Sequence, residues 1–128
     1  MPDSTRFREW FEMARKDLRG AAILFEHDAD NALVCFHCQQ AAEKYLKGYL
    51  IYKTGILHEG HNLVKLCRRA AGFEPRFNRH LKDSAFLNTF YIEARYPAED
   101  PMEITHENTQ ECIDIADRIM KEVTGAIG

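Results

Sequence analysis

The chain has 128 residues, a formal net charge of -3 at pH 7, and a content of 45% hydrophobic and 29% charged residues. These values are typical of one globular domain with a core of its own, which we assign to residues 1–128. The sequence shows neither a membrane-spanning run of apolar residues nor a signal peptide, so we expect a cytoplasmic protein with no membrane partner and with its four cysteines reduced.

Apolar residues recur at helical spacing along most of the chain, and no segment shows the alternation of a strand. Capping residues, glycines and prolines divide the pattern into five segments. The fourth segment has ragged apolar spacing between Leu81 and Phe86, which allows a kink or a break there. The sequence therefore predicts an all-α bundle of four or five helices. The expected helices run approximately over Thr5–Phe25, Asn31–Lys53, Asn62–Ala71, Pro75–Ala94 and onward from a cap at Thr105.

The second expected helix has one narrow polar stripe opposite a broad apolar face. Four polar residues follow one another at helical spacing, so they should form a charged ridge that faces away from the core. They are Gln40, Glu43, Lys44 and Lys47. Phe36 falls on the same ridge, and a large aromatic side chain there is typical of a contact surface. We therefore predict that these five residues lie at an interface, and that the protein is a homodimer.

Charge is distributed unevenly along the chain. Residues 61–97 hold seven Lys/Arg against three Asp/Glu, whereas residues 98–128 hold two against eight. One interpretation is a local basic surface for nucleic acid. The other is that these charges meet the acidic C-terminal helix, within the fold or across a dimer. The basic side chains concerned are Lys65, Arg68, Arg69, Arg76, Arg79 and Lys82.

Two cysteines and two histidines have the spacing of a zinc site. They are Cys35 and Cys38, followed by His58 and His61. Both cysteines, however, fall on the apolar face of a helix, where a thiol packs as a small hydrophobic group. We therefore expect packed cysteines and no metal. The sequence also shows no activated nucleophile and no phosphate-binding glycine loop, and we expect no cofactor.

Two further positions have more than one interpretation. Arg95 precedes Tyr96 and Pro97 at the end of an aromatic-rich helix, where an arginine can bind a phosphate with both arms of its guanidinium. It can equally complement the helix dipole and pack on a tyrosine. His61 is either the cap of the third helix or a polar member of a site.

Taken together, these segments resemble the HEPN domain, a family of small α-helical domains. The resemblance covers almost the whole chain and rests on a combination of segments, no one of which would suffice. They are Trp10, Ala14 and Asp17-Leu18, then residues 39–47, Gly60-His61-Asn62-Leu63 and Ala94-Arg95-Tyr96-Pro97.

The resemblance implies a four- to five-helix up-and-down bundle that is commonly a homodimer. Family members are often encoded beside a minimal nucleotidyltransferase, with which they act as a toxin–antitoxin pair. Many are metal-independent ribonucleases that use an arginine and a histidine separated by four to six residues, with the sites of two subunits brought together.

The chain departs from that ribonuclease pattern. Arg95 matches the family's arginine, but the next histidine is His106, with ten residues between them. His106 is therefore only a stand-in for the catalytic histidine. The favoured hypothesis is a dimer that binds a nucleotide, RNA or a nucleotidyltransferase through Arg95, supported by Tyr96 and His61. The alternatives are a ribonuclease that uses Arg95 and His106 across the dimer, and a helical assembly module without a ligand.

Overall fold

The computed structural model describes residues 6–95, 97, 99 and 102–127, and for residues 92–95 it describes the backbone alone. Five α-helices and one 3-10 segment make up this part of the chain, and it contains no strand. The predicted all-α bundle is therefore confirmed. The elements are α1 (Phe7–Glu26), α2 (Asn31–Thr54), α3 (Leu63–Ala71), the 3-10 segment η2 (Pro75–His80), α4 (Leu81–Arg95) and α5 (His106–Ile127).

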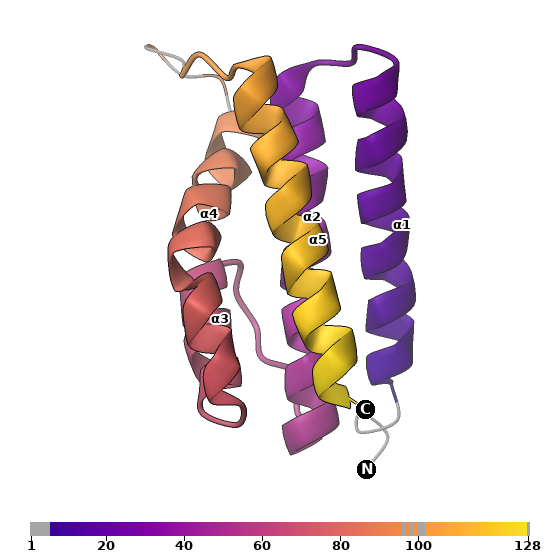
Figure 1. Cartoon of the computed structure of the whole chain (residues 1–128), viewed down its shortest axis with the longest axis vertical. Coiled ribbons are helices and arrows are strands. Elements are labelled where there is room, and N and C mark those ends of the chain that lie inside the picture. Colours follow the sequence, from indigo (N-terminus) through magenta and orange to yellow (C-terminus); the bar gives the residue numbers. More distant parts are fainter. Residues whose placement is uncertain (1–5, 96, 98, 100–101, 128) are drawn as a thin grey trace.

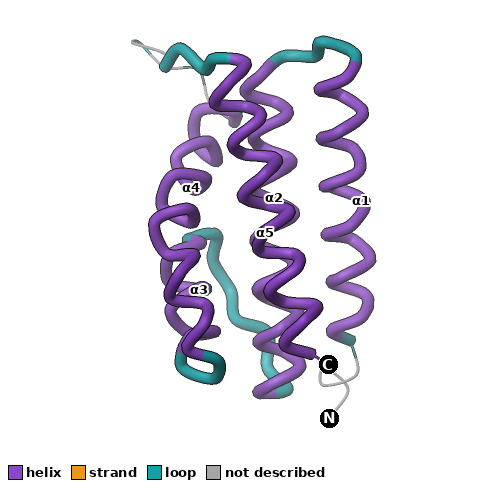
Figure 2. The backbone as a smooth tube through the Cα atoms, viewed as in Figure 1, coloured by secondary structure: helices purple, strands orange, loops and turns teal. Residues whose placement is uncertain are grey.

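The helices form an up-and-down arrangement in which α2 is central. α1 ascends and α2 descends beside it, a loop climbs back to the start of α3, and α4 and α5 complete the bundle (Figures 1 and 2). α2 packs against all the other α-helices, with α5 crossing its front in Figure 1. Consequently most residues of α2 are buried, which includes polar ones that a surface helix would expose.

The helix ends follow the capping signals in the sequence. The Asp30 carboxylate accepts from the backbone N–H groups of Ala32 and Leu33 at the start of α2. Gly55 ends that helix with φ 74, in the left-handed region that glycine adopts without a steric penalty. Thr105 caps α5 as expected, because its hydroxyl accepts from the backbone N–H of Asn108 at 3.0 Å. Apart from the start of the fourth helix, the predicted helix ends lie within about two residues of the observed ones.

The expected fourth helix is divided in two. Its first part, η2, has 3-10 geometry, and the regular helix α4 begins at Leu81, at the edge of the stretch with ragged spacing. Pro75 starts η2 and Phe77 is fully buried there. The tighter turn therefore places an aromatic side chain in the core before α4 begins.

The core lies between α2 and the helices around it. All four cysteines are free thiols and fully buried, with two on α2 and one each on α3 and α5. α1 approaches α2 closely at Gly48, where a β-carbon would lie 2.5 Å from Phe11 Cε1 and 3.2 Å from the Phe7 carbonyl oxygen. A side chain at this position would therefore push the two helices apart. None of the described helices has the length and apolar character needed to cross a membrane.

Candidate functional site

A buried polar network occupies the face of α2 between α1 and the loop before α3. Its centre is Glu43, whose side chain is only 5% exposed. One carboxylate oxygen accepts from Lys47 Nζ at 3.0 Å, and the other accepts from Gln39 Nε2 at 3.3 Å. The Lys47 side chain is 7% exposed and lies over the Trp10 ring, with Nζ 5.8 Å from the ring centroid. The network thus holds a charged pair that is almost removed from water.

His61 joins this network from the loop before α3. Its Nδ1 lies 3.0 Å from Glu43 Oε1, and its backbone carbonyl accepts from Gln39 Nε2 at 3.2 Å. Because a carboxylate only accepts hydrogen bonds, Nδ1 of His61 is the donor in this contact. The cap of α3 is Asn62. Of the two roles considered for His61, the structure therefore favours membership of a polar cluster.

Aromatic rings continue from His61 toward α4. The His61 and Tyr91 rings are stacked with centroids 4.8 Å apart, and the Tyr91 and Phe36 rings lie 6.1 Å apart. The His61 side chain is 52% exposed, and Phe36 and Tyr91 are half-buried. Three elements that are distant in sequence thus contribute one strip of rings at the surface.

The expectation of a fully exposed polar ridge on α2 is wrong for Glu43 and Lys47. Both are buried by the chain's own side chains, because Trp10 and His61 cover this face of the helix. Gln40 and Lys44 are half-buried. Direct contact with a second subunit therefore remains a prediction for Phe36, Gln40 and Lys44. Glu43 and Lys47 would support that contact only indirectly, through the buried network.

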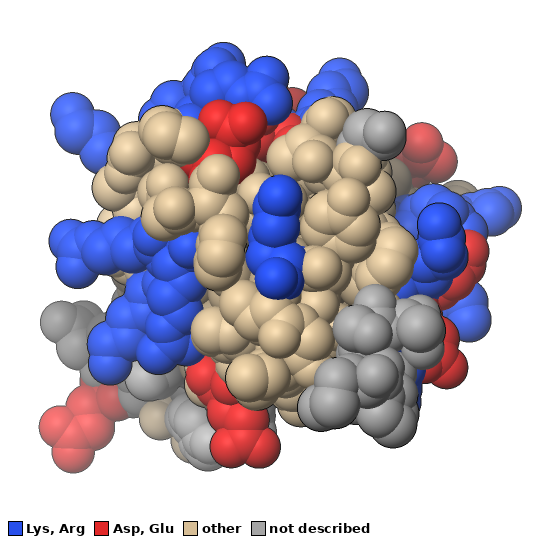
Figure 3. Space-filling view, turned by 90° about the horizontal axis from the view of Figure 1, so that it is seen from below, with Lys and Arg blue, Asp and Glu red and all other residues tan. Residues whose placement is uncertain are grey.

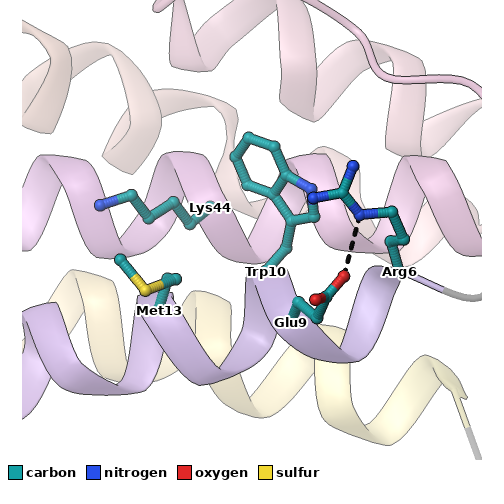
Figure 4. Close-up of a pocket in the computed structure, with 5 residues that line it drawn as sticks. All are labelled: Arg6, Glu9, Trp10, Met13 and Lys44. Atoms are coloured by element: carbon teal, nitrogen blue, oxygen red, sulfur yellow. Dashed lines mark hydrogen bonds and ion pairs between the residues drawn. The ribbon is translucent and has the colours of Figure 1, made fainter. Parts of the chain in front are cut away.

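Lys44 links α2 to α1. Its ammonium group forms an ion pair with Asp17, whose other carboxylate oxygen lies 3.3 Å from His37 Nδ1. Beside Lys44, a shallow pocket of about 260 Å³ lies between the two helices. Figure 4 shows Trp10 reaching from α1 toward α2, with Lys44 and Met13 to one side and Arg6 paired to Glu9 on the other.

Arg95 and His106 stand at the two helix ends that flank the connection between α4 and α5. Arg95 is the last residue of α4, one helical turn after Tyr91, and Tyr96 lies outside the described residues. His106 is the first residue of α5, and its ring stacks on Phe25 with centroids 4.4 Å apart. Both helix ends lie at the upper end of the bundle in Figure 1.

The histidines and cysteines of the zinc-like pattern have separate environments. Cys35 Sγ lies 3.8 Å from the Thr109 hydroxyl inside the core, and burial raises the pKa of Cys38 above its ordinary range. His58 lies beside Arg69, and burial together with that positive charge lowers its pKa. Among the described residues, no three His, Cys, Asp or Glu side chains are grouped as metal ligands.

Part of the basic segment meets the acidic C-terminal helix within the fold. Glu122 of α5 accepts from His80 Nε2 at 2.9 Å, and the Nε atoms of Arg76 and Arg79 lie 3.7 and 3.5 Å from its oxygens. At the lower end of the bundle, Lys and Arg side chains lie on several sides of an area of uncharged residues and also within it, with acidic side chains among them (Figure 3). Two of the basic side chains of this segment, Arg76 and Arg79, therefore meet an acidic partner inside one chain.

The sequence alone predicts no site role for four of the residues described above, which are Asp17, Gln39, Trp10 and Tyr91. Three of these, Trp10, Asp17 and Gln39, are nevertheless among the residues on which the family resemblance rests. A signal was available at Gln39, because an amide on the buried side of a helix needs a hydrogen-bonding partner. The stacking of Tyr91 on His61 depends on where the loop before α3 crosses α4, which helical spacing does not reveal.

Comparisons with known proteins agree with this architecture. The sequence matches the HEPN domain family model over residues 7–126. The crystal structure of TT1696 from Thermus thermophilus is 30% identical, with a TM-score of 0.79 and coverage of 94% of this chain and 97% of that one. ST0689, an archaeal HEPN homologue, is 30% identical, with a TM-score of 0.77 and coverage of 96% and 98%. A comparison with curated protein sequences gives no match.

Proposed function

The chain belongs to the HEPN domain family, and from this premise we propose that it is a homodimer that binds a nucleotide or RNA. We further propose that it acts with a minimal nucleotidyltransferase in a toxin–antitoxin type system. One observation supports a binding role above all. An exposed histidine is held by a buried carboxylate and stacked on Tyr91, one turn before Arg95 in α4. Arg95 would bind phosphate, and His61 and Tyr91 would lie beside it.

A ribonuclease that uses Arg95 and His106 is less well supported. The His106 ring stacks on Phe25 and borders a polar pocket that is also lined by Asp28 and Asp30. Two carboxylates repel a phosphate group, so these surroundings do not suit a catalytic histidine for RNA. Together with the ten-residue separation from Arg95, this favours binding over cleavage.

Replacing Arg95 by alanine is expected to weaken binding of a single-stranded oligoribonucleotide by about tenfold to a hundredfold. The reason is the loss of a hydrogen-bonded charge at the phosphate, which contributes roughly 1.5–3 kcal/mol. Lysine should restore only part of the affinity, because it keeps the charge but lacks the planar fork. Fluorescence anisotropy with a labelled strand of about eight nucleotides measures the effect.

The matched control is Arg19→Ala, which removes an exposed arginine from α1 and should leave affinity unchanged. Thermal stability of the Arg95 variant should stay within about 0.5 kcal/mol of the wild type, as for most surface substitutions. If Arg95→Ala unfolds the protein, or binds RNA as well as the wild type does, Arg95 is a structural residue. The assembly-module alternative would then be preferred.

Light scattering at micromolar concentration should give twice the chain mass of 14.9 kDa. Phe36 is the residue on which this expectation rests, because its ring is only half-buried by the described residues of its own chain. Phe36→Asp should therefore shift the equilibrium toward monomer by placing a charge in the contact. A monomer at all accessible concentrations would contradict the dimer.

A further inference from the structure

The strip formed by His61 and Tyr91 has the geometry of a base-stacking surface. The two rings are nearly parallel, with an interplanar angle of 20° and centroids 4.8 Å apart. The imidazole is only about half covered, because its side chain is 52% exposed. Flat exposed rings of this kind bind unpaired nucleobases, since every base has a π-face that can stack.

The orientation of the imidazole is fixed before any ligand binds. Glu43 holds Nδ1 at 3.0 Å, and the Gln39 side-chain amide donates both to the backbone carbonyl of His61 and to the Glu43 carboxylate. Because these partners are buried, the ring has little rotational freedom to lose when a base stacks on it.

The charges around this strip favour an unpaired base over a duplex. Glu43 is neutralised by Lys47, and Asp17 by Lys44, so the described ion pairs beside the strip add no net charge. Arg95 contributes one formal positive charge at the end of α4. Recognition of a duplex depends on many phosphate contacts and therefore on a strongly positive surface. One arginine, placed one helical turn after Tyr91 in the chain, suits one base and one phosphate.

We infer that the stacked rings of His61 and Tyr91 form a binding site for an unpaired nucleobase whose phosphate is bound at the end of α4. This inference rests on the proposed function and specifies its ligand class as a mononucleotide or single-stranded RNA. The stacked base and the phosphate contact both contribute to the affinity. Phe36 lies at the far side of Tyr91 and places the site next to the proposed dimer contact.

Three probes of equal length test the inference: single-stranded oligoadenylate, its duplex with oligouridylate, and a ribose-phosphate strand without bases. The intact single strand should bind roughly tenfold more tightly than either of the others, because stacking on one aromatic surface contributes about that much. Adenosine monophosphate in competition separates a mononucleotide ligand from an RNA ligand. The affinity for the single strand should fall with salt at a logarithmic slope of about -0.7, the value for one phosphate contact.

Tyr91→Ser should abolish the preference for the intact strand over the baseless one, and Tyr91→Phe should retain it because the ring remains. His61→Ser is the second variant, because it removes the half-exposed imidazole of the stack. Tyr52→Ser removes an exposed tyrosine near the other end of α2 and should leave binding unchanged.

Equal binding of intact and baseless strands would overturn the inference. So would a Tyr91→Ser variant that dissociates into monomers while its affinity for RNA is unchanged, because the strip would then be a subunit contact. If in either case Arg95→Ala still weakens binding, the proposed function stands without the base site. If none of the nucleic-acid probes binds to the wild type, the proposed function itself fails.

Discussion

Replacing Lys47 by methionine should lower the free energy of unfolding by about 3–5 kcal/mol, the largest effect that we expect of any single substitution in this chain. The change leaves the Glu43 carboxylate buried without its charged partner, and an uncompensated buried charge is strongly destabilising. It also removes the ammonium group that lies over Trp10. Urea unfolding at pH 7 and a fixed protein concentration measures the loss.

The double variant Lys47→Met with Glu43→Gln should recover most of the lost stability, because it removes both charges and keeps the shapes similar. The matched control is Lys121→Met on α5. Lys121 is paired with Asp117 at 2.9 Å, but its side chain is 71% exposed, so the expected change is below about 1 kcal/mol. Equal effects at positions 47 and 121 would show that Glu43 is solvated or protonated in the folded protein.

Gly48→Leu should destabilise the fold by up to about 2 kcal/mol. Any side chain here enters space occupied by α1, since a β-carbon would lie 2.5 Å from Phe11 Cε1 and 3.2 Å from the Phe7 carbonyl oxygen. The Phe11 ring can rotate, but the backbone carbonyl can move only with its helix. Overpacking of this kind commonly costs about 1–3 kcal/mol, and it outweighs the gain of about 1 kcal/mol from removing a helical glycine. Thermal and urea unfolding measure the change.

Gly20→Leu is the matched control, because no atom lies within 4 Å of the position of its β-carbon. Stability there should be unchanged or rise by up to about 1 kcal/mol, as expected from helix propensity alone. A Gly48 variant as stable as the Gly20 variant would mean that α1 can move away from α2 without loss of packing.

The helices could be predicted from the sequence because their signals are local. Apolar spacing, the caps at Asp30 and Thr105, and the left-handed glycine at position 55 all act within a few residues. The cap of α3 was placed one residue too early, at His61 instead of Asn62. The 3-10 start of the fourth segment was not predicted. It depends on Phe77 entering the core between elements that are distant in sequence.

The site was less predictable, because its geometry comes from tertiary contacts. Helical spacing placed Glu43 and Lys47 on a polar stripe but could not show that Trp10 and His61 cover that stripe. His61 was identified as a candidate, whereas its partner ring at Tyr91 was missed. A buried ion pair on a central helix resembles a surface pair in sequence, since both use the i,i+4 spacing.

All four thiols are completely buried, so the rate at which the protein is oxidised depends on how often the bundle opens. Burial raises the pKa of Cys38 and of Cys67, so these groups stay protonated and unreactive while the bundle is closed. An oxidant therefore meets these thiols only in molecules that have opened. A thiol oxidised to the sulfinic or sulfonic acid is too large and too polar to return to a close-packed core, so such molecules leave the folded population irreversibly. Under oxidising conditions, survival is then governed by the rate of unfolding rather than by the equilibrium stability.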